Sequence, residues 1–466
     1  MSSARIVILV AVGVAAALGI TAALVTAGSD GDAADRASGN PCRDSVPTRV
    51  RQATGAQLGA AGLAKLPLAP DDARVDLVAP PFSNPTGVSN PLFPISKLRS
   101  AILNGTVEGK PFRTETTLLP ETRIMEWSDG RCVEVLVSQY LAYLDGRIEE
   151  VALDHYAQAD DGSVWYLGED VFNYEDGVIA DTEGSWSAGT DGPAAMIMPG
   201  DPKVGDAYRA ENIVGLVFEE VTVKEVGETV AGPHGPVHGA ITVRELHDDG
   251  TFEDKVFAPE YGEFFTGGGG DVEALALAVP TDSLPGGVPA ALETLSSAAD
   301  DVFAAAGRGQ WRQASRAVSR MSAAWAAYRR SGDVPRRLLA PTNGVLNDFA
   351  REVANRDRAA SRQTALGVEQ AGLDLQLQYR PAAEIDLGRF DVWLRRLLLD
   401  ARARDLGALA GDVATLEWIR DRIEMALDPV DLTRLDTLLK DLRRSAGEKD
   451  FEAASATAVQ LRELLA

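Results

Sequence analysis

The hydrophobic pattern of this chain changes its period once, and the change divides the chain into two kinds of structure. Residues 106–279 contain short runs of Val, Ile, Tyr and Trp separated by turn dipeptides, which is typical of antiparallel β-strands. From residue 289 onward, apolar residues recur with a period near 3.6, as in amphipathic helices. Residues 280–288 (PTDSLPGGV) form a linker between the two patterns. We therefore expect an α+β chain with at least two domains.

Asp-Gly dipeptides punctuate the first pattern, and each lies between two apolar runs. Because such dipeptides suit two-residue hairpin turns, they predict an antiparallel meander within a β domain at residues 67–279. A meander of this kind can curl into a half-barrel with an apolar interior, a shape suited to lipids. The prolines at residues 67–95 indicate an extended segment over the surface of this domain. The turn dipeptides are Asp145-Gly146, Asp161-Gly162, Asp176-Gly177 and Asp249-Gly250.

A faint repeat runs through the second pattern, residues 289–466. Turns at Gly309, Asp357, Asp405 and Asp450 each precede an alanine-containing helix start, at spacings of 48, 48 and 45 residues. A unit of that length fits one helical hairpin, in which the Asp caps the second helix. We expect an all-α domain of repeated helical hairpins, arranged either as packed bundles or as a short solenoid.

The amino-terminal segment predicts transport to a membrane. Residues 6–27 are an uncharged apolar run of 22 residues after Arg5, long enough to span a bilayer as a transmembrane helix. We expect residues 1–27 to be a signal-anchor with its N-terminus in the cytoplasm, and the bulk of the chain to be extracytoplasmic. Cleavage near Ala27 would instead give a secreted protein. Residues 28–66 are expected to form a flexible linker.

The negative charge of the chain is confined to its first part. The formal net charge is −24; residues 1–287 hold 19 basic and 43 acidic residues, whereas residues 288–466 hold 26 of each. Because this field repels phosphate backbones, we expect no nucleic-acid binding. Cys42 and Cys132 are the only cysteines, and in an oxidising compartment we expect them to form a disulfide.

Candidate ligand and catalytic residues are few. His234 and His238 lie in a Gly/Pro-rich stretch and form a candidate metal site, with an exposed turn as the alternative. Carboxylate pairs such as Glu149-Glu150 and Glu219-Glu220 are expected to be solvated, because neighbours on a strand face opposite ways. No haem-binding, phosphate-binding or nucleophile-elbow motif occurs in the sequence, and we expect no cofactor.

Five stretches of the β domain resemble an uncharacterised family of exported bacterial proteins. That family carries an NPYFPL motif, a WYAQD…VWYFGED hairpin, a GSWEAG turn and an MP..P..GD.YRQE segment. The resemblance covers about residues 75–265 and implies an exported β domain, without implying a reaction. The helical half is similar to helical domains of unknown role in exported proteins. The stretches are residues 89–94 (SNPLFP), 154–158 (DHYAQ), 163–170 (SVWYLGED), 184–189 (GSWSAG) and 197–209 (IMPGDPKVGDAYR).

These features favour a membrane-anchored protein that binds a ligand or partner, or acts as a scaffold, without catalysis. Its partner would be an envelope protein or a lipid. One alternative is a metal-binding protein that uses the loop of His234 and His238 or the acidic clusters. A second alternative is a carboxylate-dependent hydrolase, since two suitably spaced carboxyl groups suffice for glycoside chemistry.

Overall fold

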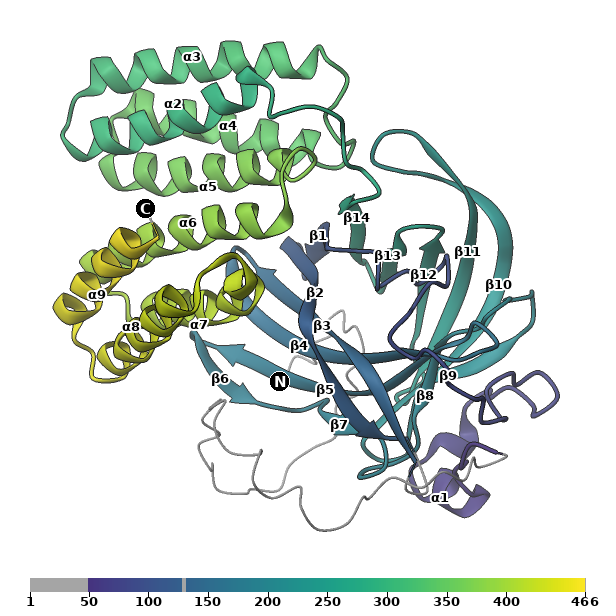
Figure 1. Ribbon diagram of the computed structural model, residues 1–466. Coiled ribbons are helices and arrows are strands. Elements are labelled where there is room, and N and C mark those ends of the chain that lie inside the picture. Colours follow the sequence, from purple (N-terminus) through teal and green to yellow (C-terminus); the bar gives the residue numbers. More distant parts are fainter. Residues whose placement is uncertain (1–48, 128–130, 466) are drawn as a thin grey trace.

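A curled β-sheet and a stack of helices lie side by side in the protein (Figure 1). The computed structural model describes residues 49–127 and 131–465. Residues 6–27, where the sequence predicts a membrane anchor, and Cys42 lie outside the described residues. Among the helices that are described, none has both the length and the apolar character needed to cross a membrane.

The described strands form one 14-stranded antiparallel sheet, which confirms the predicted meander. Its hydrogen-bonded order is β6-β5-β4-β3-β2-β1-β14-β13-β12-β11-β10-β9, with β7 and β8 paired to β5. Strand β9 contacts β8, so the two ends of the sheet approach each other and the sheet surrounds an interior (Figure 1). The strands are β1 (Ser100–Val107), β2 (Lys110–Glu126), β3 (Cys132–Leu144), β4 (Arg147–Gln158), β5 (Val164–Glu175), β6 (Val178–Asp181), β7 (Trp186–Ser187), β8 (Ala195–Met198), β9 (Ala207–Ile213), β10 (Val217–Ala231), β11 (Pro236–His247), β12 (Phe252–Ala258), β13 (Gly262–Gly268) and β14 (Asp271–Val279).

The predicted turn dipeptides connect consecutive strands. Asp145 and Gly146 join β3 to β4 with φ angles of 50° and 74°, the left-handed pair that a two-residue hairpin turn requires. Gly177, between β5 and β6, has a second reason to be glycine. A Cβ atom there would lie 2.2 Å from the backbone oxygen of Gly407, because this turn packs against a helix.

The segment before β1 covers part of the sheet. The sequence predicted a flexible linker up to residue 66, but its described part contains α1 (Gly55–Ala60) and the 3-10 helix η1 (Leu63–Lys65). Helix α1 begins at residue 55 because Thr54 and Gln57 form a capping box. Residues 66–99 contain no strand or helix. They run over the sheet, and their own side chains Leu92 and Ile95 are buried against it.

The carboxyl-terminal region consists of consecutive helices that alternate in direction (Figure 1). Asp357, Asp405 and Asp450 each accept a hydrogen bond from a backbone N–H of the following helix, as the repeat predicted. At the equivalent turn before α3, Gln310 makes no such bond. The helices are α2 (Ala290–Gly307), α3 (Trp311–Arg329), α4 (Leu339–Asn355), α5 (Arg358–Gln376), α6 (Ala382–Ala403), α7 (Leu406–Ile423), η2 (Glu424–Ala426), α8 (Pro429–Gly447) and α9 (Phe451–Leu464).

Helices cover the outer face of the sheet around β1–β4 and β14. Apolar side chains of β3 and β4 pack against α6 and α7, and those of β1 and β14 pack against α2 and α5. A buried ion cluster crosses the same boundary. Glu115 Oε2 on β2 lies 2.6 Å from Arg422 Nη1 on α7, and Arg113 Nη1 lies 2.8 Å from Asp374 Oδ2 on α5. Arg389, on α6 and 1% exposed, bonds both Asp374 and Asp386. The boundary between the sheet and the helices therefore combines apolar contacts with buried ion pairs.

Candidate functional site

Buried carboxyl groups line the inner face of the curled sheet. Strand pairing puts them on one face: Asp154 lies opposite Glu169, Glu219 lies opposite Glu211, and Glu245 lies opposite Glu253. This face is acidic, whereas the sequence predicted an apolar interior. The buried inner carboxyl groups among the described residues are Glu150, Asp154, Glu169, Glu211, Glu219, Glu245, Glu253 and Glu273.

Basic side chains on this inner face are few. Among the described residues that face inward, Lys255 on β12 and His247 at the end of β11 supply the cationic groups. Burial lowers the pKa of Lys255, but Glu245 and its acidic neighbours raise it by more, so the ammonium group stays charged. Carboxyl groups therefore outnumber cationic groups in a space shielded from water, where an unpaired charge costs several kcal/mol.

Several of these carboxyl groups have raised pKa values and therefore hold protons. Burial, reinforced by Asp154 and other carboxylates, raises the pKa of Glu150 to about 8. Burial also raises the pKa of Glu273 to about 8, with Glu263 adding to the effect. The pKa of Asp154 rises to about 7 through burial, although Tyr166 donates a hydrogen bond to it. Near neutral pH the interior therefore contains protonated carboxyl groups, which would lose their protons when a cation binds beside them.

A pocket opens onto part of this face. Its volume is about 80 Å³, well above the roughly 10–15 Å³ that a cavity needs on this measure to hold one water. Asp154, Glu263 and Glu273 supply acidic groups, and the rim is apolar. Ser138 Oγ and Glu273 Oε2 are buried with no hydrogen-bond partner in the described structure. The full lining is Phe93, Pro94, Ile95, Leu98, Ala101, Leu103, Thr116, Ser138, Tyr140, Asp154, Tyr156, Tyr261, Gly262, Glu263 and Glu273.

Aromatic rings stand next to the acidic groups of this pocket. Tyr156 stacks on Tyr166 with ring centroids 4.9 Å apart, and Phe93 meets Tyr156 edge-on at the same distance. The hydroxyl of Tyr166 donates to Asp154 Oδ1 at 2.8 Å. Burial raises the pKa of Tyr140, Tyr156 and Tyr166 well above the usual value, so their hydroxyls remain donors. The pocket is thus lined by carboxyl groups, phenol rings and apolar side chains.

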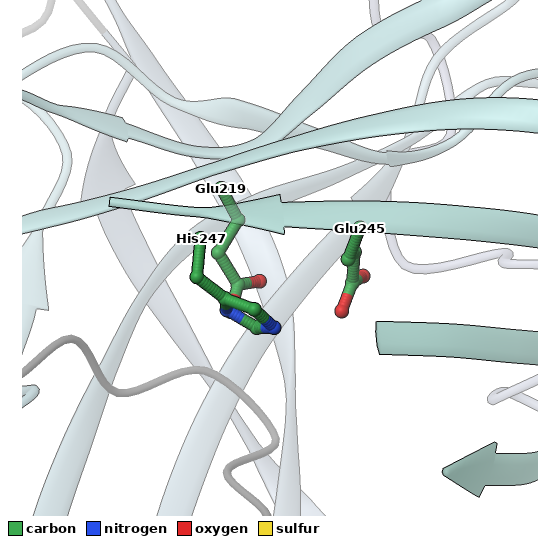
Figure 2. A group of neighbouring side chains, drawn as sticks. All are labelled: Glu219, Glu245 and His247. Atoms are coloured by element: carbon green, nitrogen blue, oxygen red, sulfur yellow. The ribbon is translucent and has the colours of Figure 1, made fainter. Parts of the chain in front are cut away.

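A second cluster lies farther along the same face, at Glu219, Glu245 and His247 (Figure 2). One potential ligand atom from each residue lies within 4.8 Å of the others. His247 Nδ1 is 3.1 Å from Glu219 Oε1, and Lys255 Nζ is 2.7 Å from Glu245 Oε2. Burial opposes the charge on His247, but the hydrogen bond with Glu219 raises its pKa to about 9.

The candidate metal residues of the sequence lie elsewhere. His234 and His238 are both exposed, and His238 Nδ1 lies 2.8 Å from Thr229 Oγ1 on the neighbouring strand. Neither belongs to the one group of three potential ligands that the described part of the chain contains. Cys132, at the start of β3, is disulfide-bonded; its predicted pairing with Cys42 stays a prediction.

The expectation that paired carboxylates are solvated was wrong at three positions. Glu150 and Glu219 are buried in the interior, 4% and 3% exposed, and Glu220 is buried on the other face, 3% exposed. Their neighbours do face the other way, as the alternation required. Glu169, Glu211, Glu245 and Glu273 carried one signal that could have identified them. Each lies within a strand rather than at a turn.

Comparison with protein-family models found no match for this chain, and comparison with curated proteins found none either.

Proposed function

We propose that this protein is a non-enzymatic binding protein whose curled β-sheet takes a small organic cation, an amine with a short apolar body. The observation that carries the proposal is the buried excess of carboxyl groups around a pocket with room for a small molecule. A ligand ammonium group would lie between Asp154 and Glu273. Its positive charge would replace the protons that these groups hold in the free protein.

The other walls of the pocket suit the same ligand class. Tyr140 and Tyr156 present phenol rings, and cations bind favourably over aromatic faces. Phe93, Ile95 and Leu98 offer apolar contact for the carbon part of an amine. Ser138 Oγ supplies a further hydrogen-bond acceptor. A neutral lipid would leave the carboxyl groups without a partner, which argues against the apolar ligand expected from the sequence.

Calorimetric titration with matched ligands tests this proposal. Butylamine and benzylamine should bind, whereas 1-butanol and benzyl alcohol, which have the same shape without the charge, should not. Binding should release protons, so the measured heat should change with the ionisation enthalpy of the buffer. Equal binding of amines and alcohols, or no binding of either amine, would overturn the proposal.

Substitutions locate the binding site. Asp154→Asn and Glu273→Gln remove a negative charge with little change in shape, and each should weaken amine binding at least tenfold. Asp170→Asn is the matched control, because Asp170 is half-exposed and pairs with Arg123. This control should bind amines as the wild type does. An equal loss in all three variants would contradict the assignment of the pocket.

We also propose that residues 6–27 anchor the protein in the membrane, with the bulk of the chain extracytoplasmic. The uncharged run of 22 residues after Arg5 supports this topology. A reporter enzyme that works only in the cytoplasm, fused to the carboxyl terminus, should be inactive. An active fusion would contradict the proposed orientation.

A further inference from the structure

We propose that Glu219, Glu245 and His247 form a binding site for a divalent first-row transition ion such as Zn²⁺. The site lies on β10 and β11, apart from the residues that line the amine pocket. It therefore goes beyond the proposed amine binding and does not depend on it.

The donor set fits this class of ion. Imidazole nitrogen suits Zn²⁺ and its neighbours in the transition series, whereas Mg²⁺ and Ca²⁺ prefer oxygen ligands alone. Two glutamates and one histidine resemble the three-ligand sets that leave a fourth position open. Figure 2 shows Glu219 and His247 adjacent, with the Glu245 side chain pointing into the same space. The potential ligand atoms lie within 4.8 Å of one another, and the three side chains would have to close around an ion to reach the distance of about 2.0–2.2 Å that zinc requires.

Strand register explains why these residues meet. Glu219 on β10 lies directly opposite His247 on β11, and Glu245 lies two residues before His247, on the same face. Both strands are held on either side by β9 and β12. The ligands thus project from adjacent strands of a continuous sheet, which limits the cost of arranging them before an ion binds.

A second observation independently points to a ligand here. Tyr208, 1% exposed, lies on β9 opposite Val221, which itself lies opposite Glu245. Its hydroxyl is buried on the same inner face and has no hydrogen-bond partner in the described structure. A buried hydroxyl without a partner loses free energy of about 1–3 kcal/mol. A water or carboxylate bound to the ion would provide the missing partner.

Further carboxyl and ammonium groups lie beside these three residues. Glu211 lies opposite Glu219 and adds a third carboxyl group, whose two oxygens are buried with no hydrogen-bond partner in the described structure. On the other side, Lys255 holds Glu245 in an ion pair at 2.7 Å. The ammonium group of Lys255 therefore competes with an ion for the same carboxylate. The His247 side chain is 21% exposed, so the ion could reach the site from solvent.

Cobalt binding tests the proposal on the full chain in detergent, after treatment with a chelator. One equivalent of Co²⁺ should produce visible d–d absorption bands, and one equivalent of Zn²⁺ should abolish them. His247→Gln and Glu219→Gln should each lower the affinity for Co²⁺ at least tenfold. The paired change His234→Ala with His238→Ala is the matched control and should leave the affinity unchanged.

Lys255→Met supplies a test with the opposite sign. Removing the competing ammonium group should raise the affinity for Co²⁺ at least tenfold. A cluster that serves only to balance charge would show no such gain.

Absence of the cobalt bands in folded wild-type protein would overturn the proposal, as would loss of binding in the His234/His238 control with binding kept in His247→Gln. Amine binding, measured on the same samples, should be unaffected by His247→Gln.

Discussion

Glu169 on β5 and Glu211 on β9 come from near opposite ends of the strand order, yet their carboxyl groups are neighbours inside the curled sheet. After burial, the main reason that the pKa of Glu169 is raised well above its usual value is Glu211. Burial and the nearby Glu219 raise the pKa of Glu211 well above its usual value as well, so both carboxyl groups hold protons near neutral pH. In the free protein, carboxyl groups are thus protonated in the region where the proposed ligands would bring positive charge.

The raised pKa values of the buried carboxyl groups predict how the free energy of unfolding depends on pH. Glu150 and Glu273, with pKa values of about 8 in the folded protein and 4.5 as unperturbed groups, bind more protons folded than unfolded between these values. Stability from each group is fully present below about pH 4.5 and is lost as pH rises toward about 8. Each group should contribute a slope of about 1.4 kcal/mol per pH unit within that window. Denaturant unfolding should therefore give greater stability at about pH 5 than at about pH 8.

Glu273→Gln is the control for that dependence. The amide does not titrate and keeps the shape of the carboxyl group, so this variant should lose less stability between the same two pH values. Asp254→Asn, on the outer face of β12 and half-exposed, should keep the wild-type dependence. A wild-type protein that becomes more stable as pH rises would contradict the protonated interior.

The buried ion cluster between sheet and helices predicts a large effect of one arginine. Arg389→Met should destabilise the protein by about 3–5 kcal/mol, because Asp374 and Asp386 would lose their shared buried partner. Arg462→Ala removes an exposed ion pair with Asp391 and should cost about 0–1 kcal/mol. Chemical denaturation of both variants measures the difference. Similar losses in the two variants would contradict the importance of burial.

Repeated aspartate caps predict a graded effect along the helical region. Asp405 accepts a hydrogen bond from Ala408 N at 3.0 Å, and Asp405→Ala should lower the free energy of unfolding by about 1 kcal/mol. Gln310→Ala is the control, because Gln310 occupies the same place before α3 without a side-chain cap. It should change stability by much less. Thermal unfolding of the two variants provides the comparison.

Cys132 carries no free thiol, and the sequence offers Cys42 as its partner. A bridge between them would close a loop of about 90 residues and stabilise the fold by at most about 4–5 kcal/mol in the chain-entropy model. Thiol labelling of unfolded, non-reduced protein should detect no reactive cysteine, and labelling after reduction should detect both. Two reactive thiols before reduction would contradict the pairing.

Local features of the fold could be predicted from the sequence. Asp145-Gly146 specifies its hairpin turn because few other residue pairs adopt two consecutive positive φ angles. Asp357, Asp405 and Asp450 specify helix starts because their carboxylates reach backbone N–H groups within three residues. Each of these outcomes depends on neighbours in the sequence, so no knowledge of the tertiary structure was needed.

The candidate sites could not be predicted in this way. Thr114 and Glu115 are consecutive on β2, yet Thr114 faces the acidic interior and bonds Glu273, whereas Glu115 faces two arginines of the helices. Alternation places the two residues on opposite faces, but it does not say which face is enclosed by the curl and which is covered by helices. The charge of these residues also points the wrong way, since a carboxylate on a strand most often faces water.

The sequence by itself determined the two-residue hairpin turns and the aspartate-capped helix starts, because these depend on backbone preferences and hydrogen bonds between near neighbours. Only the tertiary structure decided that Glu169 meets Glu211 and that Glu219, Glu245 and His247 share one space. The first contact requires the two ends of the sheet to approach each other, and the second requires the register of adjacent strands. The first therefore arises from closure of the whole sheet and the second from the pairing of two strands, and neither is encoded by a single local stretch of residues.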